Sequence, residues 1–225
     1  MKNNLLKRII SSSFLIIILC FSLFYSDYSW KVLVIFFSLA CIYEFYSLIS
    51  KIFRNKIHTT IIFFLICTYF YYLYFLLLRI KVDFGEEVIL ILLISCIFSD
   101  IGGYIVGKLF GGPKLTRISP NKTISGAIGS IVFTVFGTSL LILSLNKIDK
   151  NIILFEFSLT KCFWLFMMSI ICQLGDLLVS FLKRKANVKD TGILLPGHGG
   201  ILDRVDGIIF AIPIGILIYS LLGLN

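Results

Sequence analysis

Seven runs of apolar residues, each close to the length of a membrane-spanning helix, constrain the fold of this chain more than any other feature of its sequence. A helix needs about 20 mostly apolar residues to cross a bilayer, where only helices and closed barrels satisfy their backbone polar groups. Barrel strands alternate apolar and polar residues over short stretches, and these runs do not alternate. We therefore predict an all-α, polytopic membrane protein. The predicted spans are 9–25, 30–50, 59–78, 88–110, 124–145, 162–181 and 205–222.

The overall composition agrees with this fold. Of the 225 residues, 58% are hydrophobic and only 15% are charged, which is more apolar surface than a soluble domain of this length could bury. The first span follows Lys2, Lys7 and Arg8, and no small-residue cleavage site comes after it. We expect a retained anchor helix rather than a removed signal peptide, and a single membrane-embedded domain over residues 1–225.

The positive charges are distributed unevenly between the two ends of the spans. If the N-terminus lies inside, 15 of the 21 Lys and Arg residues fall at inner ends and 6 at outer ends. Cytoplasmic loops carry such an excess, so we expect a multi-pass protein of the cell's inner membrane with a cytoplasmic N-terminus. This distribution accounts for the net charge of +9 without a nucleic-acid partner. The two long inner loops, 111–123 and 184–204, would then carry any cytoplasmic chemistry.

Three carboxylates are predicted to lie at one depth in the membrane. Glu44, Asp100 and Asp176 each stand seven or eight residues before the basic residue at the inner end of a span. At the helical rise this is roughly 10–12 Å below that boundary. A charge near mid-membrane costs about 3 kcal/mol, so its repetition predicts a shared polar site open to the cytoplasm. Structural pairing with a nearby lysine is the alternative, and Glu44, without a further motif, is the weakest candidate.

The helical faces around these carboxylates favour the same site. Around the end of span 162–181, four residues at i, i+3, i+7 and i+10 form one polar stripe, namely Gln173, Asp176, Ser180 and Lys183. On span 88–110, Gly103 and Gly107 share a face with Asp100. These glycines leave the backbone open to close approach, either by a ligand or by another helix packed against small residues. The two roles are compatible.

The last inner loop and its flanks, residues 180–206, combine cations, glycines and carboxylates. The cations suited to phosphate groups are Lys183, Arg184, Lys189 and Arg204. Gly199 and Gly200 allow backbone N–H groups to approach phosphate oxygens. His198 stands between two glycines, where a role in positioning a phosphate is favoured over proton transfer.

Asp203 and Asp206 are three residues apart at the start of the last span, and hence on one helical face. A helix cap or an interaction with the helix dipole would explain one of them. The second would lie near the depth of Asp100 and Asp176. Clustered carboxylates without histidine or cysteine partners suit Mg²⁺, and together with Lys and Arg they are typical of transfer at phosphorus.

The earlier inner loop and its flanks, residues 108–126, contain four cations and no acidic residue. The cations are Lys108, Lys114, Arg117 and Lys122. One interpretation is a basic loop that only anchors the protein at the membrane surface. The clusters Gly-Gly-Pro-Lys and Ser-Pro-Asn-Lys-Thr, with Ser119 and Thr123, exceed what anchoring requires. We therefore favour binding of a polyphosphate or an anionic lipid head group.

Residues 180–206 resemble the signature of phosphatidate cytidylyltransferases, also called CDP-diacylglycerol synthases. The matching elements are Ser180, Lys183-Arg184, Lys189-Asp190, Gly192, Pro196, His198-Gly199-Gly200, Asp203-Arg204 and Asp206. Residues 100–126 are similar to a second segment of that family, with an Asp near the inner end of a span and Ser-Pro-x-Lys-Thr before the next one. Ser125 departs from the pattern, which favours Glu there. The first 85 residues match only in being hydrophobic, and the chain is short for the family.

The resemblance implies that the phosphate of phosphatidic acid attacks the α-phosphorus of CTP, giving CDP-diacylglycerol and pyrophosphate. It implies a requirement for Mg²⁺ and leaves a second cation open. Because a phosphate monoester already carries a nucleophilic oxygen, positioning and charge neutralisation would dominate catalysis. The implied catalytic residues are Asp176, Asp203, Asp206, Lys183 and Arg204. The implied metal ligands are Asp176, Asp203, Asp206 and Asp100. The implied substrate-binding residues are Lys108, Ser119, Lys122, Thr123, Arg184, Lys189, His198, Gly199 and Gly200.

Two other functions are weighed against this one. A related CTP-dependent transferase or kinase for another lipid would use similar residues, and no motif specifies the lipid or its acyl chains. A secondary transporter would also carry intramembrane carboxylates. Transporters often show internal repeats and paired broken helices, and neither is evident here. The oligomeric state, including a homodimer, is left open.

Overall fold

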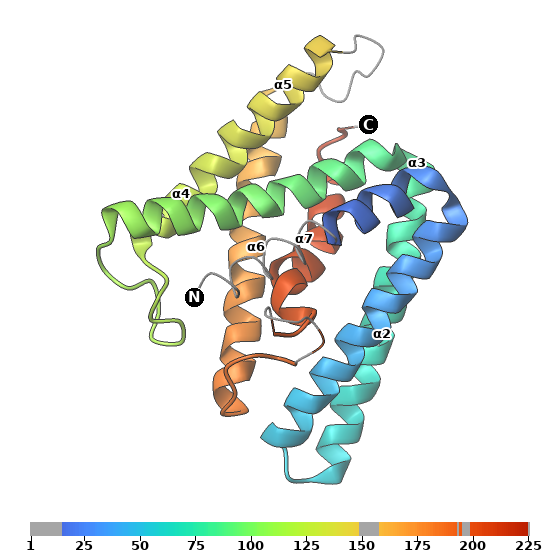
Figure 1. Ribbon diagram of the computed structural model, residues 1–225, viewed down its shortest axis with the longest axis vertical. Helices are drawn as coiled ribbons and strands as arrows, with labels where there is room; N and C mark the ends of the chain where they lie inside the picture. The colour runs from blue at the N-terminus through green and yellow to red at the C-terminus, as the bar shows by residue number, and fades with distance from the viewer. Residues whose placement is uncertain (1–14, 149–157, 193, 195–198, 225) are drawn as a thin grey trace. The chain divides into compact units, whose positions relative to one another are not determined.

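The described part of the chain is built from helices and short connections. The computed structural model describes residues 15–148, 158–192, 194 and 199–224, and Figure 1 shows its elements in chain order. The elements are α2 (Asp27–Ile52), α3 (Lys56–Phe110), α4 (Ile124–Val132), η1 (Phe133–Gly137), α5 (Thr138–Ile148), α6 (Leu159–Lys185) and α7 (Leu202–Leu221). A shorter apolar helix, Leu15–Tyr25, precedes them. The prediction of an all-α membrane protein is confirmed.

Five helical stretches in the described residues are long and apolar enough to cross a membrane. Three of them, α2, α6 and α7, contain or overlap the predicted spans 30–50, 162–181 and 205–222. The fourth consists of α4, η1 and α5, which follow one another without a break (Figure 1) and contain the predicted span 124–145. Residues 9–14 of the first predicted span lie outside the described residues. The number seven is therefore not confirmed.

The fifth stretch, α3, contains both remaining predicted spans. Its 55 residues would measure about 80 Å as a straight helix, far more than the ~30 Å thickness of bilayer hydrocarbon. Gly85 interrupts it with φ 85° and ψ 174°, values that lie outside the helical region. Glycine adopts a positive φ without the steric cost of a side chain. Gly85 therefore separates the predicted spans 59–78 and 88–110.

The described chain divides into two compact units. The first contains Met1–Arg79 and Leu182–Val205, and the second contains Ile80–Phe181 and Asp206–Asn225. In the first unit, α2 begins after Ser26, whose hydroxyl accepts a hydrogen bond from the Ser29 backbone N–H at 3.1 Å. The helix packs through Phe45 against Phe70 of α3, with 6.0 Å between ring centroids. This pair lies one residue from Glu44, so it fixes α2 close to a candidate site residue.

In the second unit, α6 and α7 enclose a core around Trp164. The Trp164 side chain is fully buried, and its indole N–H donates a hydrogen bond to the Gly215 carbonyl at 2.7 Å. The ring of Tyr219 lies across it, with centroids 5.2 Å apart. A buried indole N–H needs an acceptor, so this bond orients α6 on α7 within the unit.

The second half of α3 packs closely on α4 through small residues. A methyl group added at Gly102 would come within 2.5 Å of the Gly129 carbonyl, and one at Gly103 within 2.6 Å of the Ser130 hydroxyl. Such positions let helix backbones approach one another in membranes. The small-residue packing predicted for Gly103 and Gly107 is therefore confirmed, and a helix occupies the face beside Asp100.

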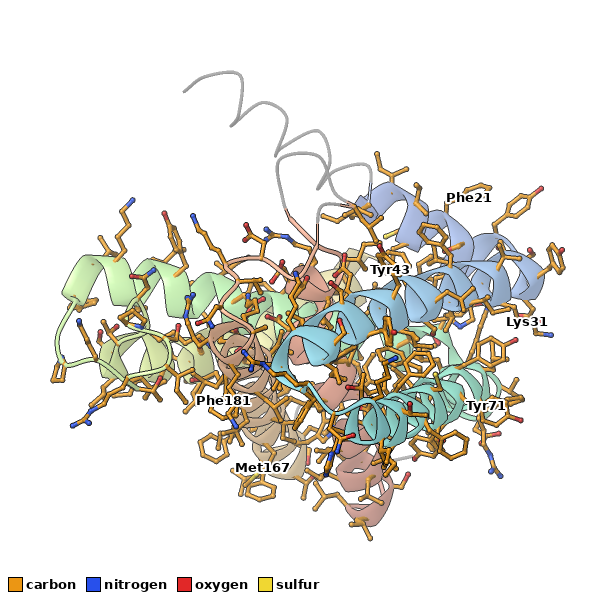
Figure 2. The ribbon with its side chains drawn as sticks, turned by 90° about the horizontal axis from the view of Figure 1, so that it is seen from below. Phe21, Lys31, Tyr43, Tyr71, Met167 and Phe181 are labelled. Carbon is orange, nitrogen blue, oxygen red and sulfur yellow. The ribbon has the colours of Figure 1, made fainter. Side chains whose placement is uncertain are left out.

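Many large apolar side chains remain exposed on the outer faces of the helices. Figure 2 shows Phe21 and Tyr71 pointing away from the neighbouring helices, and both side chains are exposed by more than half. Soluble proteins rarely expose so many large apolar side chains together, and a bilayer would cover them. The exposed surface agrees with a membrane protein.

Candidate active site

In the first unit, Asp203 connects the end of α6 to the start of α7. Its Oδ1 atom forms an ion pair with the Lys183 ammonium at 2.7 Å, and both side chains are largely buried. Its Oδ2 atom accepts hydrogen bonds from the backbone N–H groups of Thr191 and Gly200, at 2.8 and 3.1 Å, and lies 3.0 Å from the Thr191 hydroxyl. The carboxylate therefore fixes both ends of the segment 191–200.

Glu44 of α2 holds the same segment from another helix. Its side chain is fully buried, and its Oε1 atom accepts a hydrogen bond from the Ile201 N–H at 3.0 Å. Its Oε2 atom accepts from the Leu202 N–H at 2.9 Å and from the Thr191 hydroxyl at 2.7 Å. Because the first N–H groups of a helix have no partner within it, Glu44 caps α7 at its beginning.

Glycines make room for these two carboxylates. A methyl group at Gly192 would lie 2.5 Å from the Glu44 Oε1 atom, and one at Gly200 would overlap both the Thr191 hydroxyl and Glu44. Gly199 has φ 84°, a conformation that favours glycine. The structure therefore shows that the backbone at Gly199 and Gly200 bends tightly around carboxylates. The role predicted for these glycines, phosphate binding, stays a prediction.

The remaining predicted residues lie within this segment or next to it in the chain. Arg184, Lys189 and Arg204 are exposed, and Arg204 makes at least one interaction. Exposed cations can contact a soluble nucleotide, so their predicted role is compatible with their position. His198 lies outside the described residues.

In the second unit, Asp176 of α6 pairs with a lysine of the earlier basic loop. Lys122 forms an ion pair with the Asp176 Oδ2 atom, and each side chain is roughly a quarter exposed. The Ser180 hydroxyl donates a hydrogen bond to the Asp176 Oδ1 atom at 3.3 Å. The predicted polar stripe on α6 therefore exists, and pairing with a lysine, the alternative weighed for the buried acids, is confirmed for Asp176.

The loop between α3 and α4 places Lys122 by backbone hydrogen bonds. The Leu115 N–H donates to the Lys122 carbonyl at 2.8 Å, and the Ile124 N–H donates to the Pro113 carbonyl at 3.0 Å. Thr123 then caps α4, its hydroxyl accepting a hydrogen bond from the Gly126 N–H at 3.1 Å. A helix N-cap is a common role for threonine, and it leaves the predicted substrate contact of Thr123 untested.

Further predicted residues of this loop lie close to its backbone or at its edge. The Ser119 carbonyl accepts a hydrogen bond from the Lys122 N–H at 3.1 Å, so Ser119 shapes the turn before the lysine. Ser125, which departs from the family pattern, donates a hydrogen bond to the Gly111 carbonyl. The Lys108 ammonium lies over the Tyr104 ring, 5.5 Å from its centroid, which is within the range of a cation–π contact.

Two more carboxylates lie near Asp176 in the second unit. The Cys172 thiol, one helical turn before Asp176, is close enough to Asp100 of α3 and Asp206 of α7 to be affected by their charges. The backbone of α7 also approaches α6 closely, because a methyl group at Gly175 would lie 2.8 Å from the Asp206 carbonyl oxygen. Asp100 and Asp206 therefore lie within electrostatic range of α6, one turn before Asp176.

The oxygen-only character of these groups fits a hard cation such as Mg²⁺. Among the described residues, however, no three carboxylate, thiol or imidazole side chains are close enough to hold a metal ion. Both oxygens of Asp203 already meet donors of Lys183, Thr191 and Gly200, and both oxygens of Asp176 meet donors of Ser180 and Lys122. Metal binding by Asp100, Asp176, Asp203 and Asp206 stays a prediction.

A groove of about 250 Å³ has lining residues from the loop that carries Lys122 and from α6, the helix that carries Asp176. It is lined by Leu115, Thr116, Ile131, Ile170, Gln173, Leu174 and Leu177. Gln173 donates to the Ala127 carbonyl at 3.4 Å and to the Ser169 hydroxyl at 3.2 Å. The groove is thus mostly apolar, and Asp176 is next to the lining residue Leu177 in the sequence of α6.

Sequence reasoning found most of these residues and missed two roles. Thr191 was not singled out, although its N–H and hydroxyl join Asp203 to Glu44. The depth of Glu44 in its span was the available signal, but the partners of Glu44 are about 150 residues away in the chain. Only the folded chain brings them together.

Helices of membrane-spanning length that carry lysine–carboxylate pairs next to basic loops define a polytopic α-helical membrane protein with a charged pair in each of its two units. This is the class to which the fold and the site assign the chain. The chain belongs to the cytidylyltransferase family, whose family model matches residues 11–222.

Curated relatives of the chain carry a more specific name. It is 37% identical over 150 residues to the phosphatidate cytidylyltransferase of Helicobacter pylori (strain J99), an alignment that covers 66% of this chain and 53% of the relative. It is 44% identical over 136 residues to that of Brucella suis (60% and 47%), and 39% identical over 146 residues to that of Mycobacterium leprae (62% and 42%). The chain therefore spans about half the length of the curated relatives it matches.

Proposed function

We propose that this protein transfers CMP from CTP to phosphatidic acid, giving CDP-diacylglycerol and pyrophosphate for phospholipid synthesis. The match to the cytidylyltransferase family over residues 11–222 carries the proposal. Relatives named phosphatidate cytidylyltransferase support the choice of lipid. Family membership also leaves the transporter alternative without support.

The residues would act mainly by positioning and by neutralising charge. A phosphate oxygen of phosphatidic acid forms a bond to the α-phosphorus of CTP, and the bond from that phosphorus to the oxygen of the β-phosphate breaks, releasing pyrophosphate. Lys183, Arg184, Lys189 and Arg204 would bind the nucleotide phosphates, and Lys122 would meet the lipid phosphate or the nucleotide. Because charge spreads over the phosphate oxygens in such reactions, fixed cations stabilise the transition state.

Asp176, Asp206, Asp100 and Asp203 would hold Mg²⁺, which neutralises phosphate charge when it is bound. Asp100 and Asp206 both lie within electrostatic range of Cys172, one turn from Asp176, and would have to move closer to Asp176 to hold one ion with it. Lys122 partly neutralises the charge of Asp176. A phosphate that binds Lys122 would free Asp176 for the cation, so the same pair would serve both ligands.

The groove beside Lys122 and Asp176 would accept an acyl chain of the lipid. Its lining is apolar except for Thr116 and Gln173, and its neighbouring lysine has the charge that a lipid phosphate requires. A lipid would thus enter sideways from the bilayer, while the nucleotide arrives from water. We place the protein in the inner membrane, with this site on the cytoplasmic side, because the basic loops gather at one set of span ends.

The test is transfer of label from nucleotide to lipid. Protein purified in detergent would be incubated with CTP labelled at the α-phosphate, phosphatidic acid and Mg²⁺, and label would be followed into the lipid phase. Asp176→Asn and Asp206→Asn should each reduce transfer by about 100-fold or more, the scale for losing a group that stabilises developing charge. Asp83→Asn, a carboxylate outside the site, is the matched control. Absence of transfer by intact wild-type protein, or full transfer by both site variants, contradicts the proposal.

A further inference from the structure

The carboxylate of Glu44 has partners at both ends of one segment. The Thr191 hydroxyl lies at the start of that segment, and the Ile201 and Leu202 N–H groups lie at its end. One buried side chain therefore fixes the distance between two points eleven residues apart in the chain.

These partners are uncharged, which makes the arrangement unusual for a buried acid. Glu44 is fully buried, and it accepts hydrogen bonds from two backbone N–H groups and one hydroxyl of the described residues. Burial of a carboxylate is costly unless hydrogen bonds replace its water. The amino end of a helix supplies such bonds together with a favourable dipole. The Glu44 carboxylate therefore occupies the anion-binding position at the start of α7.

The residues next to these attachment points are the proposed nucleotide-binding ones. Lys189 lies two residues before Thr191, and Asp203 and Arg204 follow Leu202 directly. Asp203 in turn holds the Lys183 ammonium at 2.7 Å. Movement of either end of the segment would move these charges. Glycines confirm how close the fit is, since Gly192 and Gly200 have no room for a methyl group beside Glu44.

We propose that Glu44 is a positioning residue for CTP, which sets the cations of residues 183–204 by clamping Thr191 and the start of α7. Glu44 itself contacts neither substrate. This inference rests on the proposed function, because it assigns the nucleotide to these cations. It also predicts an effect that can be measured without activity, namely that the backbone at Ile201 and Leu202 loosens when the carboxylate is changed.

The first experiment measures kinetics. Glu44→Gln keeps the size of the side chain but replaces one acceptor oxygen with an NH₂ group that faces donors. We expect the KM for CTP to rise roughly tenfold or more, the scale for leaving a buried donor unpaired, while the KM for phosphatidic acid stays within about twofold. Leu48→Ala is the control, because Leu48 is fully buried one turn further along α2 and has no part in the clamp.

The second experiment works without turnover. Hydrogen–deuterium exchange of peptides containing Ile201 and Leu202 should accelerate roughly tenfold or more in Glu44→Gln and remain near the wild-type rate in Leu48→Ala. If wild-type protein transfers no label, the proposed function fails while this measurement still decides whether the clamp exists. Should Glu44→Gln fail to fold, Thr191→Val and Thr191→Ser provide a matched pair, since only serine keeps the hydroxyl that binds Glu44.

The expected pattern is a raised KM for CTP in Thr191→Val, near-wild-type behaviour in Thr191→Ser, and less than additive effects when Thr191→Val is combined with Glu44→Gln. Unchanged exchange and unchanged KM for CTP in Glu44→Gln would overturn the proposal. So would an equal rise of that KM in Leu48→Ala, because general destabilisation would then explain both variants.

Discussion

At the scale of single residues, Asp203 and Lys183 form the most constrained pair. Both are largely buried, and Asp203 also accepts bonds from the backbone at Thr191 and Gly200. Removing one partner of a buried pair leaves an uncompensated charge, at a cost of about 3–5 kcal/mol. The two partners are not equivalent, since only Asp203 also holds the loop.

We therefore expect Asp203→Ala to lower the free energy of unfolding more than Lys183→Ala does. Lys183→Ala leaves Asp203 bound to Thr191 and Gly200, whereas Asp203→Ala also leaves those donors without this acceptor, adding about 1–3 kcal/mol. Chemical denaturation of the detergent-solubilised variants measures the difference. Equal losses in both variants would show that the backbone bonds to Asp203 contribute nothing.

A glycine between the two carboxylates supplies a second residue-scale prediction. Gly200→Ala places a methyl group where the Thr191 hydroxyl and Glu44 lie, so we expect the segment to shift and the melting temperature to fall. Gly112→Ala is the control. Its φ of 103° costs about 1–2 kcal/mol for a residue with a side chain, but no atom lies within 4 Å of the added methyl. A Gly200→Ala variant as stable as Gly112→Ala would contradict the tight fit.

At the scale of elements, the groove along α6 distinguishes two leucines that lie one turn apart on that helix. Both Leu174 and Leu178, one turn later, are exposed, but only Leu174 is among the residues that line the groove. We expect Leu174→Trp to raise the KM for long-chain phosphatidic acid by about fivefold or more, as the larger side chain fills the apolar space. A short-chain substrate should be affected less. Leu178→Trp should leave both values unchanged, and identical effects at the two positions would argue against an acyl-chain groove.

The sequence also determines elements and contacts to different extents. Spans such as 30–50 and 124–145 could be predicted because hydropathy over about 20 residues is a local property. Gly85 was not predicted as the break in α3, because a lone glycine carries no mark of its φ. Pairing of Asp176 with a nearby lysine was predicted only as one of two alternatives, and Lys122 was not identified as the partner, since an entire span separates the two residues. Contacts made by distant residues, such as those of Glu44, depend on the packed helices.

At the scale of the whole molecule, the orientation in the membrane is the main open prediction. In a variant without its six native cysteines, Lys114→Cys should react with a membrane-impermeant maleimide only from the cytoplasmic side. Asp83→Cys, in the short connection between the predicted spans 59–78 and 88–110, should react only from the opposite side. Labelling of intact cells against inverted vesicles makes the comparison. Reaction of both cysteines from one side would overturn the proposed topology.

The pairing of Lys122 with Asp176 also bears on how the chain is made. Lys122 leaves the ribosome before α6, so the counter-ion of Asp176 is already synthesised when that helix reaches the membrane. A lone aspartate at the centre of a span opposes insertion by about 3 kcal/mol. Pairing with Lys122 reduces this barrier. It can do so only after the hairpin of α3 and α4, which carries Lys122, has inserted. Synthesis from the N-terminus thus favours insertion of α3 and α4 before α6.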